Sequence, residues 1–283
     1  MSTPQRVKNN TIGGWLQSAT TQLLAASIDT ARLDACIILE DQLRTNRAHI
    51  AAHPEQPMTE ADLSIINQKL TDRLAHKPLA YIRGSVEFYG RSFIVSEDVL
   101  VPRPESEQMI ELVLKNPTPA ASVLDIGTGS GALAITTKLE RPSWNVDGID
   151  IDPSCISIAK LNATALGANV HFNKEDLATC DLSGFDIILA NLPYVPTDYP
   201  INKAASYEPG LALWGGTDGL DVFRQLFVTT RRQTSPALLY TESLVDQHQA
   251  LNDLAQSHGY ECIDEVALIQ VFKPAIVQAQ PQA

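Results

Sequence analysis

The sequence predicts an α/β protein in which a small helical domain precedes a doubly wound, mostly parallel sheet. From Ser122 to Thr241, short apolar runs alternate with helical patterns, which is typical of βαβ units. From Ile12 to His76, the apolar residues recur only at helical spacing. With 283 residues the chain is longer than one average domain, so one large domain and one smaller domain are expected.

Composition and charge argue against several classes of protein. Apolar residues make up 44% of the chain and charged residues 19%, which provides enough apolar material for a core. The formal net charge is -12 and the pI about 4.9, whereas proteins that grip nucleic-acid phosphates usually present a basic face. No apolar run approaches the roughly 20 residues of a membrane span. We therefore expect no direct binding to nucleic acid and no association with a membrane.

The cysteines and histidines predict neither a disulfide framework nor a metal site. The four cysteines are scattered and form no Cys-x-x-Cys pair, which fits a reducing, cytoplasmic setting. His49 and His53 have helical spacing, but no third candidate ligand is near them. We expect a monomeric cytoplasmic protein without a bound metal.

The first helices are predicted to form a small bundle. Apolar residues from Ile12 to Leu24 form one stripe, and a second helix is expected to run from Asp29, as its N-cap, to Leu43. The Thr-x-x-acid pattern at Thr59 predicts the start of a third helix. These helices carry no catalytic cluster, so their expected role is support or substrate recognition.

A β-hairpin is predicted between the two domains. Two β-prone runs, 86–89 and 93–95, are joined through Gly90 and Arg91. Beyond them, the prolines on either side of Arg103 favour an extended backbone that presents the guanidinium with little freedom. The expected boundaries are a helical domain at 1–77, the hairpin bridge at 78–100, the larger domain at 101–277 and a frayed tail at 278–283.

The predicted elements of the larger domain follow one another in order. Strands are expected at residues 123–126, 146–151, 170–172, 185–189, 237–241, 261–266 and 269–272. Helices are expected from residue 131 and over 153–166, 220–231 and 248–258. The last two strands are close enough in sequence to pair as an antiparallel hairpin.

A glycine-rich segment lies at the junction of the first strand with its helix. Its glycines let the backbone turn sharply and approach a ligand, and the following helix directs N-terminal amides toward it. Asp150 ends the next strand, where a carboxylate can accept hydrogen bonds from both hydroxyls of a ribose. The segment comprises Asp125, Gly127, Thr128, Gly129, Ser130 and Gly131.

Three interpretations fit this segment. It binds a dinucleotide, it binds S-adenosylmethionine, or it is a glycine-rich turn that binds no ligand. The spacing Gly127-x-Gly129-x-x-Ala132 passes for a dinucleotide fingerprint, although an isolated pattern of this kind is weak. The crowded Gly-x-Gly-x-Gly with Asp125 just ahead resembles motif I of S-adenosylmethionine-dependent methyltransferases. After the third strand, two interpretations are open: Asp176 accepts from an adenine amino group while Leu177 packs on the ring, or Asp176 simply caps a turn.

The discriminating segment is Asn191 to Tyr194, which follows the fourth strand. Ligands of open α/β sheets bind at the carboxyl ends of strands where the strand order reverses, so Asn191 and the glycine loop are expected to share one crevice. A dehydrogenase needs an acid or base there, and this segment offers none. A planar NH₂ group, in contrast, can donate to the Asn191 side-chain oxygen and the Leu192 carbonyl while Tyr194 packs on its face.

Taken together, these segments resemble the protein-(glutamine-N5) methyltransferases that modify the Gly-Gly-Gln glutamine of class-1 peptide chain release factors. The resemblance covers nearly the whole chain and is highly specific in combination. Besides the glycine loop and the Asn-Leu-Pro-Tyr segment, it rests on residues 31–35, 78–84, 87–90, 102–107, 207–209 and 211–220.

The resemblance implies a Rossmann-like, seven-stranded methyltransferase domain that uses S-adenosylmethionine and supports translation termination. The residues implied to bind the cofactor are Asp125, Gly127, Thr128, Gly129, Ser130, Gly131, Asp150, Asp176, Leu177 and Asn191. The residues implied to hold the glutamine and form the catalytic clamp are Asn191, Leu192, Pro193 and Tyr194, with Arg103 and Glu107 as substrate-binding neighbours.

The chain departs from the family pattern at a few positions. The usual Asn-Pro-Pro-Tyr has Leu192 at its second place, and Leu177 stands where an aromatic residue is common. The family's Leu-Glu-Ile-Gly appears as residues 240–244, Tyr-Thr-Glu-Ser-Leu, and the closing strands lack terminal arginines.

Two other functions remain open from the sequence. An adenine-N6 methyltransferase would present a flipped base's NH₂ to the same clamp, although the acidic charge argues against nucleic acid. A non-catalytic S-adenosylmethionine-binding scaffold would fit the departures at Leu192 and Leu177.

Overall fold

The structure is a computed structural model that describes residues 10–232 and 238–275. The chain divides into two compact units. The first unit extends to Gly84 and also takes in Asn202–Tyr207, and the second comprises Ser85–Ile201 and the chain from Glu208 onward. The predicted tail at 278–283 lies outside the described residues.

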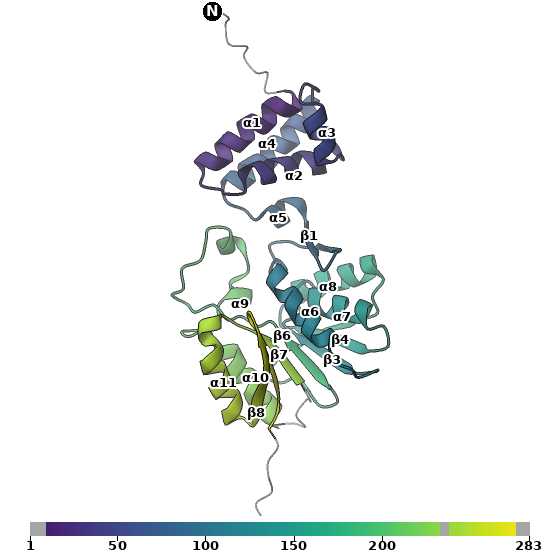
Figure 1. Cartoon of the computed structure of the whole chain (residues 1–283), viewed down its shortest axis with the longest axis vertical. Coiled ribbons are helices and arrows are strands. Elements are labelled where there is room, and N and C mark those ends of the chain that lie inside the picture. Colours follow the sequence, from purple (N-terminus) through teal and green to yellow (C-terminus); the bar gives the residue numbers. More distant parts are fainter. Residues whose placement is uncertain (1–9, 233–237, 276–283) are drawn as a thin grey trace, which may run out of the picture. The chain divides into compact units, whose positions relative to one another are not determined.

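The first unit is a helical bundle (Figure 1). Its helices are α1 (Ile12–Ala25), α2 (Ala31–Leu43), α3 (Arg47–Ala52), α4 (Glu60–Leu74) and α5 (Leu79–Arg83). A buried apolar cluster that includes Trp15, Leu39 and Ile66 joins α1, α2 and α4. The cluster forms because each of these helices turns one apolar stripe inward.

Of the two helix starts predicted from capping residues, one is confirmed and one is wrong. Thr59 accepts from the Asp62 amide at 3.1 Å, which confirms the predicted cap of α4. The prediction of Asp29 as the cap of α2 was wrong, because Thr30 occupies that position and makes no side-chain cap bond. The hydroxyl of Tyr207, far along the chain, donates to the Ala75 carbonyl at 2.8 Å, so a late segment completes this unit.

The second unit begins with the predicted hairpin. Strands β1 (Ser85–Phe88) and β2 (Arg91–Ile94) pair antiparallel through the turn at Tyr89 and Gly90. Residues 79–83, expected in the bridge, instead form α5. Arg103 has the predicted extended backbone, and a one-turn helix, Pro104–Ser106, and helix α6 (Glu107–Leu114) follow it.

The seven-stranded sheet confirms the predicted doubly wound architecture. Its strands are β3 (Ser122–Ile126), β4 (Asn145–Asp150), β5 (His171–Lys174), β6 (Ile187–Ala190), β7 (Leu238–Glu242), β8 (Tyr260–Val266) and β9 (Ile269–Pro274). Their order is β5-β4-β3-β6-β7-β9-β8. All neighbours are parallel except β9, which runs antiparallel to both β7 and β8 and so forms the expected closing hairpin.

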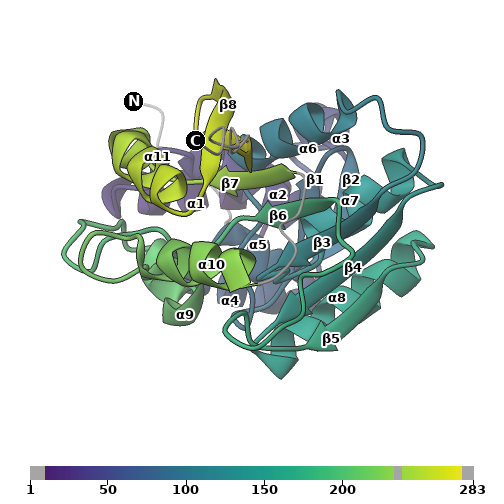
Figure 2. The ribbon, with the colours of Figure 1, turned by 90° about the horizontal axis from the view of Figure 1, so that it is seen from below.

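Helices cover both faces of this sheet (Figure 2). One face carries α6 with α7 (Ala132–Glu140) and α8 (Pro153–Leu166), and the other carries α10 (Asp221–Arg232) and α11 (His248–Ser257). Successive strand residues point to opposite faces, so Ile187 enters the first core and Ile188 the second. The short helix α9 (Gly210–Leu213) precedes α10 in the chain, and the turn Val245–Gln247 lies between β7 and α11.

The strand order reverses between β3 and β6. The chain proceeds from β3 outward to β4 and β5, and then returns to place β6 on the other side of β3. The carboxyl ends of β3 and β6 carry the glycine loop and Asn191, respectively. Strand β6 therefore lies beside β3, and the topology brings the two segments to one edge of the sheet.

Asn162 links this edge to the hairpin. Its side chain is fully buried in α8, accepts from the Ile94 amide at 2.7 Å, and donates to the carbonyls of Ile94 and Ser130 at 3.0 and 2.9 Å. One amide thereby connects α8, β2 and the glycine loop.

We expect Asn162→Ala to destabilise the protein. The variant removes the partner of these backbone groups, and each buried group left unpaired costs about 1–3 kcal/mol. The free energy of unfolding, measured by urea denaturation, should therefore fall by about 2–4 kcal/mol. Thr164→Ala, on the exposed side of the same helix, serves as the control and should change stability by less than about 0.5 kcal/mol. Equal stability of Asn162→Ala and the wild type would contradict this role.

Asp125 carries a buried carboxyl group at the end of β3. It accepts from the Thr128 hydroxyl at 2.6 Å and the Ala134 amide at 3.2 Å. Burial raises the pKa of Asp125 from 3.8 to about 7, outweighing the opposing effect of these hydrogen bonds. In the unfolded chain the group loses its proton at lower pH than in the folded protein. Stability therefore falls as the pH rises from about 4 to about 7.

Asp125→Asn should remove this pH dependence, because an amide does not titrate. Between about pH 5 and about pH 8, the wild-type protein should lose up to about 3 kcal/mol of unfolding free energy relative to the variant. Urea denaturation at both pH values, without added ligand, measures the difference. Parallel losses in the two proteins would show that Asp125 does not cause the dependence.

Candidate active site

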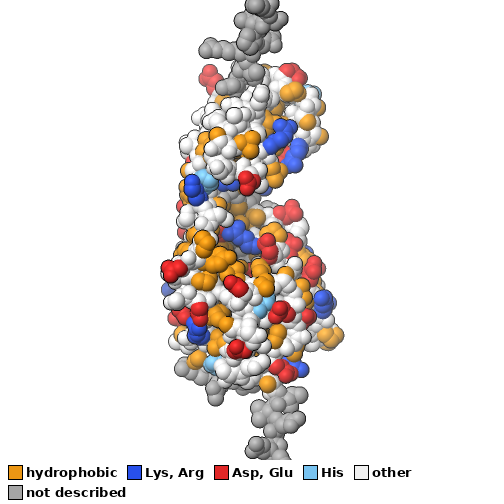
Figure 3. Space-filling view, turned by 60° about the vertical axis from the view of Figure 1, so that its left-hand side comes forward, with side chains coloured by type: hydrophobic (Ala, Val, Ile, Leu, Met, Phe, Trp, Pro, Cys, Tyr) orange, Lys and Arg blue, Asp and Glu red, His pale blue; other side chains and the backbone are white. Residues whose placement is uncertain are grey.

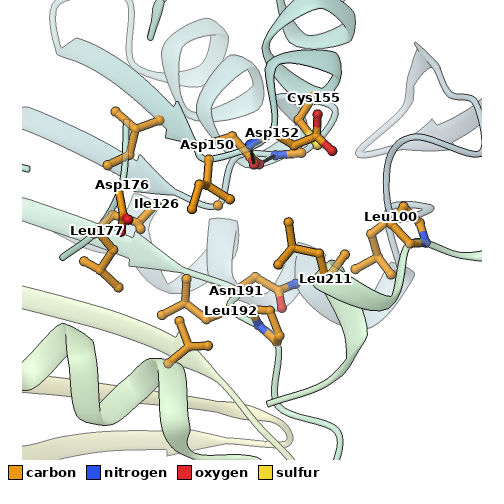
Figure 4. A pocket seen from close by; sticks show the side chains of 18 of the residues that line it. Leu100, Ile126, Asp150, Asp152, Cys155, Asp176, Leu177, Asn191, Leu192 and Leu211 are labelled. Carbon is orange, nitrogen blue, oxygen red and sulfur yellow. Dashed lines mark hydrogen bonds between the residues drawn. The ribbon is translucent and has the colours of Figure 1, made fainter. Parts of the chain in front are cut away.

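A cavity of about 410 Å³ opens at the edge where the strand order reverses. Its volume falls in the range typical of ligand pockets. All its lining residues belong to the second unit. They come from the loop after β2, from the ends of β3, β4 and β6, from the segment after β5, and from α8, α9 and α10. Figure 4 shows Asp150 and Asp152 across the cavity from Asn191 and Leu192, with Leu177 toward one end and Leu100 toward the other.

The glycine loop leaves room in the cavity for a ligand. Gly127 and Gly129 have φ angles of 69° and 53°, in the left-handed region that favours glycine. A Cβ atom at Gly129 would meet nothing closer than the Gly127 carbonyl oxygen at 4.0 Å. A side chain at this position would therefore project into open space, which the glycine keeps free.

Asp150 fixes the loop and keeps accepting capacity. Its Oδ2 accepts from the Gly129 amide at 2.9 Å and its Oδ1 from the Asp152 amide at 2.9 Å. Each carboxylate oxygen has a further lone pair, and the side chain lines the cavity. Burial raises the pKa of Asp150, while the two amides act in the opposite direction. This arrangement can accept hydrogen bonds from a pair of ribose hydroxyls.

The end of the cavity near β5 suits a planar heterocycle. Asp176 and Leu177 both line it, together with the apolar side chains of Ile126 and Ile149. One oxygen of Asp176 accepts from the Ala178 amide at 2.8 Å, which orients the carboxylate. The predicted contacts of Asp176 and Leu177 with an adenine are compatible with these positions.

Asn191 lines the cavity with its side chain held from behind. Its Nδ2 donates to the Ser106 hydroxyl and to Oε2 of Glu242, each at 3.0 Å. The Ser106 hydroxyl in turn donates to Oε2 of Glu242 at 2.7 Å. Within the described part of the chain, no hydrogen bond reaches Oδ1 of Asn191. This oxygen is free to accept from a ligand in the cavity.

The backbone after Asn191 is fixed by close packing. The Leu192 side chain is buried against the glycine loop, where a Cβ on Gly127 would lie 3.4 Å from its Cδ2. Gln247 donates to the Tyr194 carbonyl at 2.8 Å. A Cβ on Gly219 would lie only 2.1 Å from that same carbonyl, so glycine is required for the close approach.

Tyr194 directly follows Pro193, which lines the cavity, but it does not line the cavity itself and contacts Glu242. Its hydroxyl donates to Oε1 of Glu242 at 3.0 Å. Burial and the neighbouring Glu242 carboxylate raise the pKa of Tyr194 well above its usual value. The phenol therefore stays protonated at ordinary pH and offers a flat, neutral face.

Several residues predicted for the site lie outside the cavity lining. Asp125, Thr128, Ser130 and Gly131 belong to the glycine-rich segment but do not line the cavity, and their hydrogen bonds shape its turn. Arg103 forms an ion pair with Glu208. Glu107 accepts from the Tyr89 amide at 2.7 Å and so supports the hairpin turn. Direct contacts of these residues with cofactor or substrate remain predictions.

Two polar residues of this region, Ser106 and Glu242, were not among the predicted site residues. Both are almost fully buried, at 3% and 1% exposure, and both are bonded to Asn191. Their signals in the sequence are the Pro-Arg-Pro-Glu-Ser-Glu segment and the segment that corresponds to Leu-Glu-Ile-Gly. Each segment belongs to the family pattern, but neither one predicts that Ser106 and Glu242 are in contact.

Comparison with known proteins agrees with this fold. Residues 14–84 match the family described as PrmC N-terminal domain, and residues 105–204 match the family described as Methyltransferase small domain. A crystal structure of a methyltransferase from Pyrococcus furiosus shares the fold, with a TM-score of 0.50 and 16% identity over 77% of this chain and 100% of that chain. No helix in the described parts of the chain is long and apolar enough to span a membrane.

Curated relatives extend the similarity across both units. The release factor glutamine methyltransferase of Koribacter versatilis (strain Ellin345) is 38% identical over 216 residues, which are 74% of this chain and 77% of the relative. That of Coxiella burnetii (strain RSA 493 / Nine Mile phase I) is 32% identical over 250 residues, which are 87% and 90% of the two chains. The chain belongs to the family of release factor glutamine methyltransferases.

Proposed function

We propose that this enzyme transfers the methyl group of S-adenosylmethionine to the side-chain amide nitrogen of the Gly-Gly-Gln glutamine in class-1 peptide chain release factors. The observation that carries the proposal is the orientation of Asn191. Its NH₂ group is bonded to Ser106 and Glu242, so its oxygen is left for the cavity that also contains the glycine loop. The relatives' names supply the protein and the residue that are modified.

The residues of the cavity can hold an amide NH₂ in the plane needed for transfer. The two hydrogens of this NH₂ group each have one acceptor. One is Oδ1 of Asn191, and the other is the carbonyl oxygen of Leu192. In the described part of the chain no other group donates to either. With both hydrogens engaged, the nitrogen faces the cofactor side of the cavity with its plane fixed. Proximity and orientation of this kind can contribute roughly 7–11 kcal/mol to the lowering of a barrier.

S-adenosylmethionine supplies an electrophilic methyl group on its sulfonium. The loop at Gly127 and Gly129, the Asp150 carboxylate and the segment of Asp176 and Leu177 would hold it, and their geometry leaves the necessary space. The nitrogen gains the methyl group as the carbon–sulfur bond breaks, with the neutral thioether S-adenosylhomocysteine as the leaving group. The nitrogen becomes acidic in the process and releases its proton to solvent, so the transfer step itself needs no general base. The protonated Tyr194 accordingly acts as a packing face for the amide rather than as a base.

The remaining assignments concern recognition of the protein substrate. We assign the helical unit, predicted at 1–77, to substrate recognition, and Arg103 and Glu107 to the neighbourhood of the bound glutamine. We further propose a cytoplasmic monomer that does not grip nucleic acid. On the face in Figure 3, Lys and Arg side chains are scattered among Asp and Glu and form no continuous stripe among the described residues, which supports a protein substrate.

Purified enzyme should transfer labelled methyl from S-adenosylmethionine to a class-1 release factor. Transfer should disappear when the Gly-Gly-Gln glutamine of the release factor is replaced by alanine, because that amide nitrogen is the acceptor. Scintillation counting and peptide mass spectrometry measure the product. Labelling that persists after this replacement, or labelling of nucleic acid in its place, would overturn the proposed function.

Asn191→Ala should lower turnover by at least about 100-fold, since it removes one of the two acceptors that hold the NH₂ group. Binding of S-adenosylmethionine, measured by calorimetry, should change by less than about threefold, because the loop and Asp150 are untouched. Asn173→Ala, an exposed asparagine of β5, is the matched control and should retain full turnover. An Asn191→Ala enzyme with wild-type turnover would rule out the amide clamp.

A further inference from the structure

Glu242 ends β7 and bonds three polar side chains from two other segments of the chain. Ser106 reaches it from the turn before α6, Asn191 from the end of β6, and Tyr194 from the loop that follows. Only 1% of the residue is exposed, and it does not line the cavity. Glu242 therefore touches neither the space for the cofactor nor that for the substrate.

The chemistry of a carboxylate determines what the bonded groups must do. An ionised carboxylate accepts hydrogen bonds and cannot donate them. Its partners must therefore present N–H or O–H, which places Nδ2 of Asn191 toward Glu242 and Oδ1 toward the cavity. Without such a partner, an asparagine amide can turn about its last torsion and exchange its oxygen with its nitrogen. The reversed amide would present donors to the substrate NH₂ group, which is itself a donor.

Ser106 strengthens this constraint. It donates to the same oxygen of Glu242 at 2.7 Å and accepts from Nδ2 of Asn191 at 3.0 Å. Because its single proton is engaged by Glu242, its oxygen is left as an acceptor. Two acceptors on the same side of Nδ2 thus hold the NH₂ end of the Asn191 amide toward Glu242. The same carboxylate also fixes the Tyr194 hydroxyl.

We propose that Glu242, assisted by Ser106, is the positioning residue that sets the amide direction of Asn191 and the ring of Tyr194 for methyl transfer. This inference rests on the proposed function, since it concerns how the clamp for the target amide is assembled. Glu242 acts through its partners and does not touch the reacting atoms.

The test compares Glu242→Gln with the wild type in the labelled-methyl assay on a release factor. Glutamine has nearly the same shape but carries an NH₂ group, which competes with the donors around it. When that group faces Asn191, it favours the reversed amide. We expect kcat to fall about 10- to 100-fold. The KM for the release factor and the Kd for S-adenosylmethionine should stay within about twofold, because Glu242 contacts neither ligand.

Two further variants keep the test decisive. Glu265→Gln makes the same chemical change in β8, where the side chain contacts Gln270, and should leave kcat and KM unchanged. Ser106→Ala retains the Glu242 carboxylate but removes one acceptor of the Asn191 amide, and should lower kcat about 5- to 20-fold with KM unchanged. This variant also answers the question if Glu242→Gln fails to fold, as judged by its thermal unfolding.

The outcomes separate the two proposals. Wild-type enzyme that fails to label the glutamine contradicts the proposed function. Wild-type enzyme that labels it, combined with unchanged kcat in folded Glu242→Gln or, failing that, in Ser106→Ala, overturns the positioning role alone. A rise in KM with constant kcat also overturns it, because that would mean substrate binding rather than alignment had been lost.

Discussion

The candidate site depends on one buried carboxylate. Burying a charged group without partners costs several kcal/mol, and for Glu242 hydrogen bonds from Ser106, Asn191 and Tyr194 offset that cost. Desolvation still raises the pKa of Glu242 while these bonds act against the rise. The carboxylate is stable in place only if its donors are in place. The requirement is reciprocal, because the donors in turn owe their orientation to the carboxylate.

This constraint explains features of the fold that are distant in sequence. The parallel pairing of β6 with β7 places Ala190 opposite Thr241 and so brings the following residues, Asn191 and Glu242, together. The one-turn helix Pro104–Ser106 places the Ser106 hydroxyl beside them, and α6, which follows it, packs in the core of the same unit. Gly219 and Gln247 then hold the Tyr194 carbonyl. Several elements thus restrict a short loop, which is the condition for precise alignment of a small planar group.

The sequence predicted those parts of the structure that depend on local pattern. Apolar periodicity located the strands and helices of the sheet domain, and turn chemistry located the hairpin and the cap at Thr59. Short helices, among them α5 and α6, were not predicted. They contain too few residues to show the repeated apolar spacing that distinguishes a helix from a linker. The cap at Asp29 failed because Thr30, one residue nearer the helix, takes that position.

The sequence pattern predicted few of the contacts between segments that are distant in the chain. The glycine loop, Asp150 and Asn191 could be brought together, because the rule for the carboxyl ends of parallel strands applies to any such sheet. The meeting of Ser106 with Glu242 depends on side-chain geometry across three segments, which periodicity does not encode. The same holds for Asn202–Tyr207, which joins the helical unit although it follows β6 in the chain.

Leu192 shows how the site can accept a departure from the family pattern. A proline at this place would restrict φ through its ring. Here the side chain of Leu192 is 3% exposed and packs in the core with Ile188 and Ala190, beside the glycine loop. Tertiary packing therefore restrains a backbone that the residue itself leaves freer. Under the proposed function the substrate amide uses only the carbonyl of this residue, so the side chain can change as long as the backbone remains held.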